Sequence, residues 1–276
     1  MATVAALSSF VARGAVGLRA IVPALERMGH EAVAVPTVVL SSHPRHRQWA
    51  GHAADPATLA DMVAALDANG WLAQINAVLT GYLPSAAHVG IAEDLIARVR
   101  AHRADAIVVC DPVLGDDPDG LFMAESVAEA VRDKLLPLAD VVKANRFELA
   151  WLSGRAVTSP ESAVAAARSL GRPVVVASSV PYGGERAIAN VVVTPDRAAF
   201  CAVEREDGVP RGTGDLLGAL LTGHIASGRD AFESLAHAAF RVARMIDASR
   251  SHPELQLADA GAWQASGSVL LTEIAG

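Results

Sequence analysis

Cysteine is almost absent from this chain, which has two cysteines, Cys110 and Cys201, among its 276 residues. Both lie in unrelated apolar stretches, so the pattern argues against a disulfide framework and is typical of a protein of the reducing cytoplasm. No apolar run reaches the length that a membrane-spanning helix needs, so we expect no membrane partner. The N-terminus lacks the basic stretch of a signal peptide, and we expect residues 4–7 to form a first strand.

Basic residues are also fewer than acidic residues. Lysine and arginine number 23 against 30 acidic residues, which gives a net charge of −7. No local cluster of basic residues offsets this balance. A nucleic-acid-binding surface needs such a cluster to neutralise phosphates, so the sequence argues against a nucleic-acid partner.

Three motifs that define large enzyme classes are missing. There is no Gly-x-Ser-x-Gly turn, which argues against a hydrolase of the nucleophile-elbow type. The P-loop pattern and a Gly-x-Gly-x-x-Gly after the first strand are absent as well. If the protein binds phosphate, it must therefore use another glycine turn.

Apolar residues make up 52% of the chain, and aromatic residues 4%. Along the sequence, Val-rich runs alternate with Ala/Leu-rich segments. This alternation predicts a central, mostly parallel sheet with helices on both faces, in one doubly wound α/β domain over residues 1–276. We expect strands over residues 4–7, 32–40, 75–80, 106–110, 141–142, 173–177, 187–193 and 197–203, the last two antiparallel. We expect helices over residues 14–29, 59–71, 89–99, 127–136, 162–170, 214–227 and 230–248.

The most informative segment is the glycine turn Gly212-Thr213-Gly214, followed by Asp215 and a long apolar helix. Backbone N–H groups at such a helix start hold anions, phosphate above all. An aspartate at the same place can take a proton from a hydroxyl group while the amides hold a phosphoryl group. The structural alternative is that Asp215 only caps the helix.

Polar residues stand at the expected ends of several strands. They are Ser9, Tyr82, Asp111, Asn145 and Ser178. Ligands of open parallel sheets bind at the carboxyl ends of the strands, so we expect these residues to converge on one crevice.

Two carboxylates in this set could serve a metal ion. Asp111 directly follows a buried strand, and Glu148 lies one turn into a helix that Asn145 would cap. Mg²⁺ takes few protein carboxylates and keeps waters and phosphate oxygens, which fits such a pair beside a phosphate site. The structural alternatives are a turn that closes a strand and a plain helix cap.

The polar stretch over about residues 38–52 is expected to form a flap over the sheet edge. It contains His43, Arg45 and His46. A metal site is poorly supported there, because no cysteine or acidic partner stands at a matching spacing. A mobile lid over an anionic ligand, with Arg45 as its charge, is the better interpretation.

Taken together, these segments resemble the pyridoxal kinases of the ribokinase-like superfamily. The superfamily pattern is carried by Gly212-Thr213-Gly214-Asp215 and by Asn145-Arg146-Phe147-Glu148. The closer resemblance runs in order from about residue 4 to 257 and uses Ser9, Gly14, Gly17, Pro36-Thr37-Val38, Ser41-Ser42-His43, Trp49-Ala50-Gly51, Thr80-Gly81-Tyr82-Leu83, Cys110-Asp111-Pro112-Val113-Leu114-Gly115-Asp116 and Glu254-Leu255-Gln256-Leu257.

This resemblance implies ATP-dependent phosphorylation of the 5′-hydroxymethyl group of pyridoxal or its relatives, with Mg²⁺, in a cytoplasmic homodimer. It implies Asp215 as the base and the glycine turn as the anion hole. The pyridine ring would lie among Ser9, Thr37, His43 and Tyr82. Asp111 and Glu148 would serve metal and phosphates with support from Asn145, and Ser178 would lie on the nucleotide side.

Some positions depart from the family pattern. The flap usually reads His-Thr-x-Tyr and here reads His43-Pro44-Arg45-His46; Ala144 replaces a usual proline, and Ala177-Ser178 replaces a Thr-Ser or Lys-containing pair. Two alternatives stay open at this point. One is a kinase of the same fold for another hydroxymethyl heterocycle, such as hydroxymethylpyrimidine, and the other is a non-catalytic vitamin-binding or regulatory relative.

Overall fold

The computed structural model describes residues 1–274, without the side chain of residue 185. Its strands are β1 (Thr3–Val11), β2 (Glu31–Leu40), β3 (Gly51–Ala53), β4 (Ile75–Thr80), β5 (Ile107–Cys110), β6 (Gly115–Asp116), β7 (Gly120–Leu121), β8 (Val141–Asn145), β9 (Val174–Tyr182), β10 (Ala187–Val193), β11 (Ala198–Glu204) and β12 (Thr272–Glu273). Its α-helices are α1 (Leu18–Arg27), α2 (Pro56–Ala68), α3 (Ala86–His102), α4 (Glu125–Ala130), α5 (Arg146–Ser153), α6 (Pro160–Ser169), α7 (Thr213–Ala226), α8 (Ala231–Ala248) and α9 (Ala260–Gln264).

A ten-stranded sheet with the order β12-β11-β10-β9-β8-β5-β4-β1-β2-β3 forms the centre of the molecule. The strands from β2 through β1, β4, β5 and β8 to β9 pair in parallel, whereas both edges are antiparallel. The carboxyl ends of the parallel strands therefore meet along one edge of the sheet, where ligands bind in folds of this kind.

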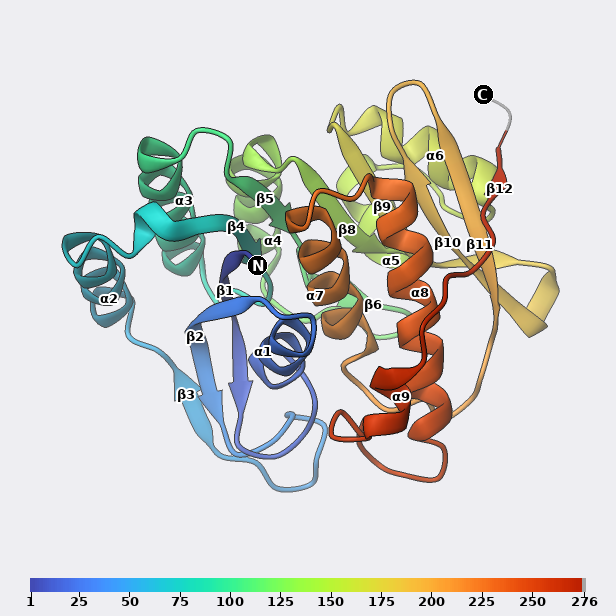
Figure 1. The fold of residues 1–276 in the computed structure, drawn as a ribbon, viewed down its shortest axis with the longest axis horizontal. Coiled ribbons are helices and arrows are strands. Elements are labelled where there is room, and N and C mark those ends of the chain that lie inside the picture. The colour runs from blue at the N-terminus through green and yellow to red at the C-terminus, as the bar shows by residue number, and fades with distance from the viewer. Residues whose placement is uncertain (275–276) are drawn as a thin grey trace.

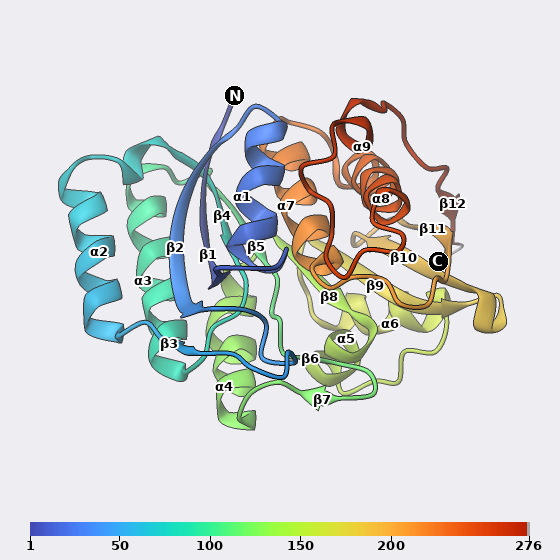
Figure 2. The same cartoon turned by 90° about the horizontal axis from the view of Figure 1, so that it is seen from below.

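Helices cover both faces of the sheet, as the sequence predicts (Figures 1 and 2). The buried residues of α1, α7 and α8 share one apolar core with one face of the sheet, and those of α2, α3, α4, α5 and α6 share a second core with the other. The burial of both faces explains why the central strands read as continuous Val-rich runs. Among residues 1–274, no helix is long and apolar enough to cross a membrane.

Several predicted boundaries agree closely with the structure, and others need correction. The strand 75–80, the hairpin of β10 and β11 and the two helices α7 and α8 are confirmed within one or two residues. Ser9, expected just after the first strand, lies inside β1, where the register shifts between Ser8 and Ser9. Ser178, expected to end its strand, lies in the middle of β9, because the strand continues along β10 after its parallel pairing with β8 ends at Ser178.

Two further predictions differ in detail. Asn145 is the last residue of β8 rather than a residue beyond it, and it also caps α5. The helix expected over 127–136 is α4 followed by a π turn over 131–135 and a 3₁₀ turn over 136–138, which contains Pro137 and precedes β8. The flap is the loop between β2 and β3, and Ser41 N donates to the Ala50 carbonyl at 2.7 Å across its base.

Candidate active site

The glycine turn forms the start of α7, and its first glycine has a steric reason to be there. Gly212 is the N-cap residue with φ of 100°, in the left-handed region that favours glycine. A Cβ at this position would lie 1.7 Å from the carbonyl oxygen of Ala15. Only glycine therefore lets the turn pack against the loop that follows β1. The first N–H groups of a helix that starts in this way are the groups that can hold an anion.

Asp215 lies in the first turn of α7, next to this packed loop. Burial raises the pKa of its carboxyl group to about 6, and the charge of Asp111 adds to the rise, whereas the Gly17 backbone N–H and Lys143 oppose it. A carboxylate with a pKa near neutrality is suited to accept a proton in a reaction. The structure thus places the predicted base in the first turn of α7 with a raised pKa.

Gly17 lies between Asp215 and the strand residue Ser9: its backbone N–H interacts with the Asp215 carboxylate, and its Cα lies close to Ser9. Its φ is 55°, and a Cβ there would lie 2.3 Å from Ser9 Oγ. The Ser9 hydroxyl therefore lies directly beneath the loop whose N–H opposes the pKa rise of Asp215. These contacts bring the first predicted substrate residue and the predicted base to the same place.

Thr37 and Tyr82 lie close to one another near the carboxyl ends of β2 and β4. The Thr37 hydroxyl donates to the Tyr82 carbonyl oxygen at 2.7 Å, and Tyr82 N donates to Ser8 Oγ at 3.3 Å. Thr37 is buried and Tyr82 is partly exposed. The structure thus brings two more of the predicted substrate residues together, through a hydrogen bond from the Thr37 side chain to the Tyr82 backbone.

The flap carries the other two predicted substrate residues and is fastened at two points. The Arg45 guanidinium pairs with Asp119 in the turn between β6 and β7, and His46 Nε2 lies 3.4 Å from Glu254 Oε1. Burial lowers the pKa of His43, and the charges of Arg211 and Arg45 lower it further. Arg45 was expected to be available to an anionic ligand, and the structure instead gives it a carboxylate partner.

A buried ion pair lies behind the glycine turn. Lys143 Nζ donates to Asp111 Oδ2 at 2.9 Å, and each side chain is 5% exposed. The other carboxylate oxygen of Asp111, Oδ1, is buried and has no hydrogen-bond partner among the described residues. Asp111 therefore keeps one oxygen that a cation could use.

Glu148 is held by backbone groups on both of its oxygens. Oε1 accepts from Leu114 N at 2.9 Å and Oε2 from Asn145 N at 2.8 Å, while Asn145 Oδ1 accepts from Glu148 N. This reciprocal capping box fixes the start of α5 against the loop after β5. Burial raises the pKa of Glu148 to about 7, and the charge of Asp111 adds to the rise.

A cavity of about 860 Å³ opens on the far side of the glycine turn. Its lining includes the predicted nucleotide-side residues Asn145, Ser178, Thr213 and Gly214, together with Lys143. Apolar side chains of α8, among them Val242 and Ile246, form one wall. A planar apolar group could lie against this wall while an attached anion reaches the glycine turn.

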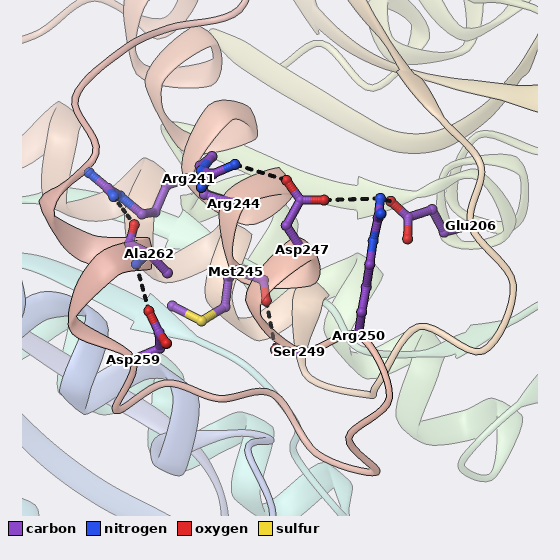
Figure 3. A network of polar contacts seen from close by, with 9 residues as sticks. All are labelled: Glu206, Arg241, Arg244, Met245, Asp247, Ser249, Arg250, Asp259 and Ala262. Atoms are coloured by element: carbon purple, nitrogen blue, oxygen red, sulfur yellow. Dashed lines mark hydrogen bonds and ion pairs between the residues drawn. The ribbon is translucent and has the colours of Figure 1, made fainter.

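Three of the residues that line this cavity, Glu206, Asp247 and Arg250, form a network of ion pairs (Figure 3). Arg250 lies 2.9 Å from Glu206 and 3.0 Å from Asp247 at the end of α8. Glu206 belongs to the loop that leads into the glycine turn. The network therefore links that loop to α8.

The predicted residues separate into two groups around the start of α7. Ser9, Thr37, Tyr82 and the flap lie on the β1 side, and the cavity with Ser178 and Asn145 lies on the other. Asp111 and Glu148 are buried behind the turn and are not part of the cavity lining. An alcohol on one side and a phosphoryl donor on the other would meet at Asp215.

Lys143 is the main residue that the sequence interpretation missed. The sequence nevertheless contains a signal, since the chain has only two lysines and Lys143 stands inside the apolar run Val141-Val142-Lys143-Ala144. A lysine in a buried strand is rare unless it is paired. Asp116, which also lines the cavity, was part of a quoted motif but was given no role.

Comparison with known proteins shows the family to which the chain belongs. The phosphomethylpyrimidine kinase family model matches residues 12–256. A pyridoxal kinase of Corynebacterium diphtheriae is 33% identical over 246 residues, which cover 87% of each chain. A pyridoxine/pyridoxal/pyridoxamine kinase of Bordetella bronchiseptica is 37% identical over 252 residues, which cover 90% of this chain and 89% of the other. The chain belongs to the pyridoxal kinase family.

The solved structures agree with this family membership. Pyridoxal kinase of Leishmania donovani in complex with ADP and pyridoxamine superposes with a TM-score of 0.93 at 29% identity and covers 99% of both chains. The ribokinase-like fold, with its mostly parallel sheet, two helical layers and flap, is thereby confirmed.

Proposed function

We propose that this protein is an ATP-dependent kinase of vitamin B6 salvage that phosphorylates the 5′-hydroxymethyl group of pyridoxal, and of pyridoxine or pyridoxamine. The observation that carries the proposal is the position of Asp215. It lies at a glycine turn between the Ser9 side, suited to a small alcohol, and a cavity suited to a nucleotide. We further propose that one domain spans the chain and that the protein is a cytoplasmic homodimer. Light scattering of the purified protein would test whether it is a dimer.

The mechanism follows from the arrangement of this chain's own residues. Asp215 accepts the proton of the attacking hydroxyl group. The N–H groups of residues 212–215 stabilise charge on the transferring γ-phosphoryl group. Ser9, Thr37, His43, Arg45 and Tyr82 are proposed to surround the alcohol, and Asn145 and Ser178 to contact the nucleotide. Phosphoryl transfer requires mainly positioning and electrostatics, so one base and one anion hole suffice.

Mg²⁺ fits the charge balance of the site. Asp111, Glu148 and Asp215 place three carboxylates around the single ammonium of Lys143, and Asp111 Oδ1 has no partner within the described part of the chain. In that same part, no group of three or more His, Cys, Asp or Glu residues could hold a metal by itself. Such a site suits Mg²⁺ shared with phosphate oxygens. When bound, the ion would neutralise charge on the phosphates, with Asp111 and Glu148 as the proposed protein carboxylates.

The metal role predicts a specific response to substitution. We expect Asp111→Asn to raise the Mg²⁺ concentration for half-maximal activity roughly 10- to 100-fold. Pyridoxal affinity, measured by calorimetry without nucleotide, should stay nearly unchanged. Glu148→Gln should move the Mg²⁺ requirement less, because both of its oxygens already accept backbone N–H groups. A large loss of pyridoxal affinity in Asp111→Asn would overturn the assignment.

The raised pKa of Asp215 predicts the pH dependence of the reaction. The carboxylate must be ionised to accept a proton, and its pKa is raised to about 6. Activity should therefore be full well above pH 6 and fall as the pH drops through 6. We expect kcat/KM, which reports the free enzyme, to include an ionisation near 6 that comes from Asp215. An acid limb near pH 4 would contradict the buried environment of the base.

The flap contacts predict an effect on binding rather than on the chemical step. Arg45→Ala removes the ion pair with Asp119, and Asp119→Ala should have the same effect. A partly exposed pair contributes at most about 1 kcal/mol, so we expect KM for substrate or ATP to rise about two- to fivefold with a smaller change in kcat. Hydrogen exchange of the flap amides should slow when both ligands are bound.

Arg47→Ala provides the matched control for the flap, since Arg47 makes no ion pair among the described residues. It should leave KM unchanged. If Arg45→Ala and Arg47→Ala behave alike, or if flap protection is the same in the free and the bound protein, the flap is not a lid.

The substrate is tested by a coupled assay with ATP-Mg²⁺ and a panel of pyridoxal, pyridoxine, pyridoxamine and hydroxymethylpyrimidine. Hydroxymethylpyrimidine belongs in the panel because the matching family model is described as phosphomethylpyrimidine kinase. We expect pyridoxal to give the highest kcat/KM. A higher value for hydroxymethylpyrimidine would replace the proposed substrate, and no turnover with any of the four would leave a binding protein instead of an enzyme.

A further inference from the structure

Lys143 presents a buried cation to the nucleotide side of the glycine turn. It extends from β8 and lines the cavity together with Ser178, Thr213 and Gly214. Its side chain is 5% exposed, so bulk water hardly reaches it. The ammonium therefore lies in a region of low dielectric, where a charge acts strongly on an anion in the cavity.

The start of α7 is shaped around the ion pair of Lys143 and Asp111. A Cβ on Gly214 would lie 3.3 Å from Lys143 Nζ, and a Cβ on Gly218, one turn later, would lie 3.1 Å from Asp111 Oδ2. Side chains at these two positions would crowd the pair. The same glycine turn that is proposed to hold phosphate is thus in contact with the ammonium.

The ammonium also has hydrogen-bonding capacity to spare. A lysine ammonium carries three donors, and among the described residues only Asp111 Oδ2 accepts from it. The surrounding carboxylates are Asp111, Glu148 and Asp215, and all three act on Lys143. Without Lys143, these carboxylates would repel the phosphates of a nucleotide.

We propose that Lys143 is a tethered cation of the phosphate site: its ammonium neutralises Asp111 and donates to phosphate oxygens of the bound nucleotide, so that no dissolved monovalent cation is needed there. The proposal rests on the proposed ATP-dependent kinase activity but is independent of which alcohol is phosphorylated. In this assignment Lys143 supplies the positive charge beside Asp111.

Nucleotide binding without turnover tests this role directly. We expect Lys143→Met to weaken ADP binding roughly 10- to 100-fold, as expected for a lost charge-assisted hydrogen bond. Adenosine, which lacks phosphates, should bind as it does to the wild type. Lys134→Met is the matched control, because Lys134 is the other lysine of the chain and is exposed. It should change neither affinity. ADP binding of Lys143→Met equal to that of the wild type, or an equal loss for ADP and adenosine, would overturn the proposal.

Chemical rescue separates a tethered cation from a purely structural ion pair. Lys143→Ala leaves room beside Asp111, so ammonium, methylammonium or potassium ions should restore ADP affinity at least tenfold in that variant. The wild type should bind ADP equally in potassium chloride and in tetramethylammonium chloride, whose cation is too large for the space. A folded Lys143→Ala that no cation rescues contradicts the proposal. The proposal is also contradicted if the wild-type protein needs potassium to bind ADP. This comparison of salts uses the wild type alone, so it does not depend on the folding of a variant.

Discussion

Replacing Asp215 with Asn is expected to lower kcat by roughly 10²- to 10⁴-fold while the protein stays folded and still binds nucleotide. Asparagine keeps the size of aspartate and its ability to accept from the Gly17 N–H, but it cannot take a proton from the substrate hydroxyl. Single-turnover measurements with pyridoxal and ATP-Mg²⁺ would report the loss in the chemical step. A variant that keeps more than about a tenth of the wild-type kcat would show that Asp215 is not the base.

The same substitution should make the protein more stable at alkaline pH. Burial raises the pKa of Asp215 to about 6 from its ordinary value of 3.8, so the folded state resists ionisation of this group more than the unfolded state does. A shift of this size corresponds to at most about 3 kcal/mol, and partial exposure reduces it to about 1–2 kcal/mol. We expect the Tm of Asp215→Asn at pH 8 to rise by roughly 2–8 °C. The gain should shrink as the pH falls below 6.

Asp133→Asn is a control in which the pKa of the carboxyl group is shifted in the opposite direction. Arg132 lowers the pKa of Asp133, so its ionised form is favoured in the folded state. This substitution should not raise the Tm at pH 8. A rise in Tm for both variants would indicate a general effect of reduced negative charge rather than the buried environment of Asp215.

Gly212→Ala is expected to lower kcat/KM by roughly a hundredfold or more, mainly through ATP. The added Cβ would lie 1.7 Å from the Ala15 carbonyl oxygen, and the residue would have to keep a φ of 100°. The clash must displace either the turn or the loop after β1. A displacement of about 1 Å in a catalytic group can cost 10²-fold in rate. Calorimetry with ADP would measure the loss of nucleotide affinity, and steady-state kinetics would measure the loss in kcat/KM.

Gly208→Ala separates steric clash from backbone strain. Gly208 has φ of 71° and lies in the same loop, but a Cβ there meets no atom within 4 Å. It should cost about 1 kcal/mol of stability and leave kcat/KM within about threefold. If the two alanine variants lose activity equally, strain in the loop explains the loss, and the packing of Gly212 against Ala15 is not what holds the anion hole.

Hydrophobic periodicity and turn chemistry predicted most elements because they are local properties. The strand 75–80 ends at Gly81, and α7 begins at a glycine turn and continues through an apolar run, so both could be placed from neighbouring residues alone. The capping box of α5 follows in the same way from Asn145 and Glu148, three positions apart. Convergence of strand-end residues also followed from topology, since parallel strands share one carboxyl edge.

Strand lengths depend on partners that periodicity does not show. Ser178 was expected to end β9, but β10 pairs with the strand beyond that point and extends it to Tyr182. Ser9 was expected after β1, but β2 keeps pairing with the strand as far as Val11.

The sequence by itself determined the α/β class, the helix start at Gly212 and the candidate base Asp215, because each is specified by residues a few positions apart. Only the tertiary structure decided that Arg45 of the flap pairs with Asp119, that Lys143 pairs with Asp111, and that the Ala15 carbonyl leaves no room for a Cβ at Gly212. These contacts join residues tens to nearly two hundred positions apart, and such pairings follow from how the strands and loops pack together. The same packing desolvates Asp215 and raises the pKa of its carboxyl group, so the basicity of this candidate base is a property of the fold.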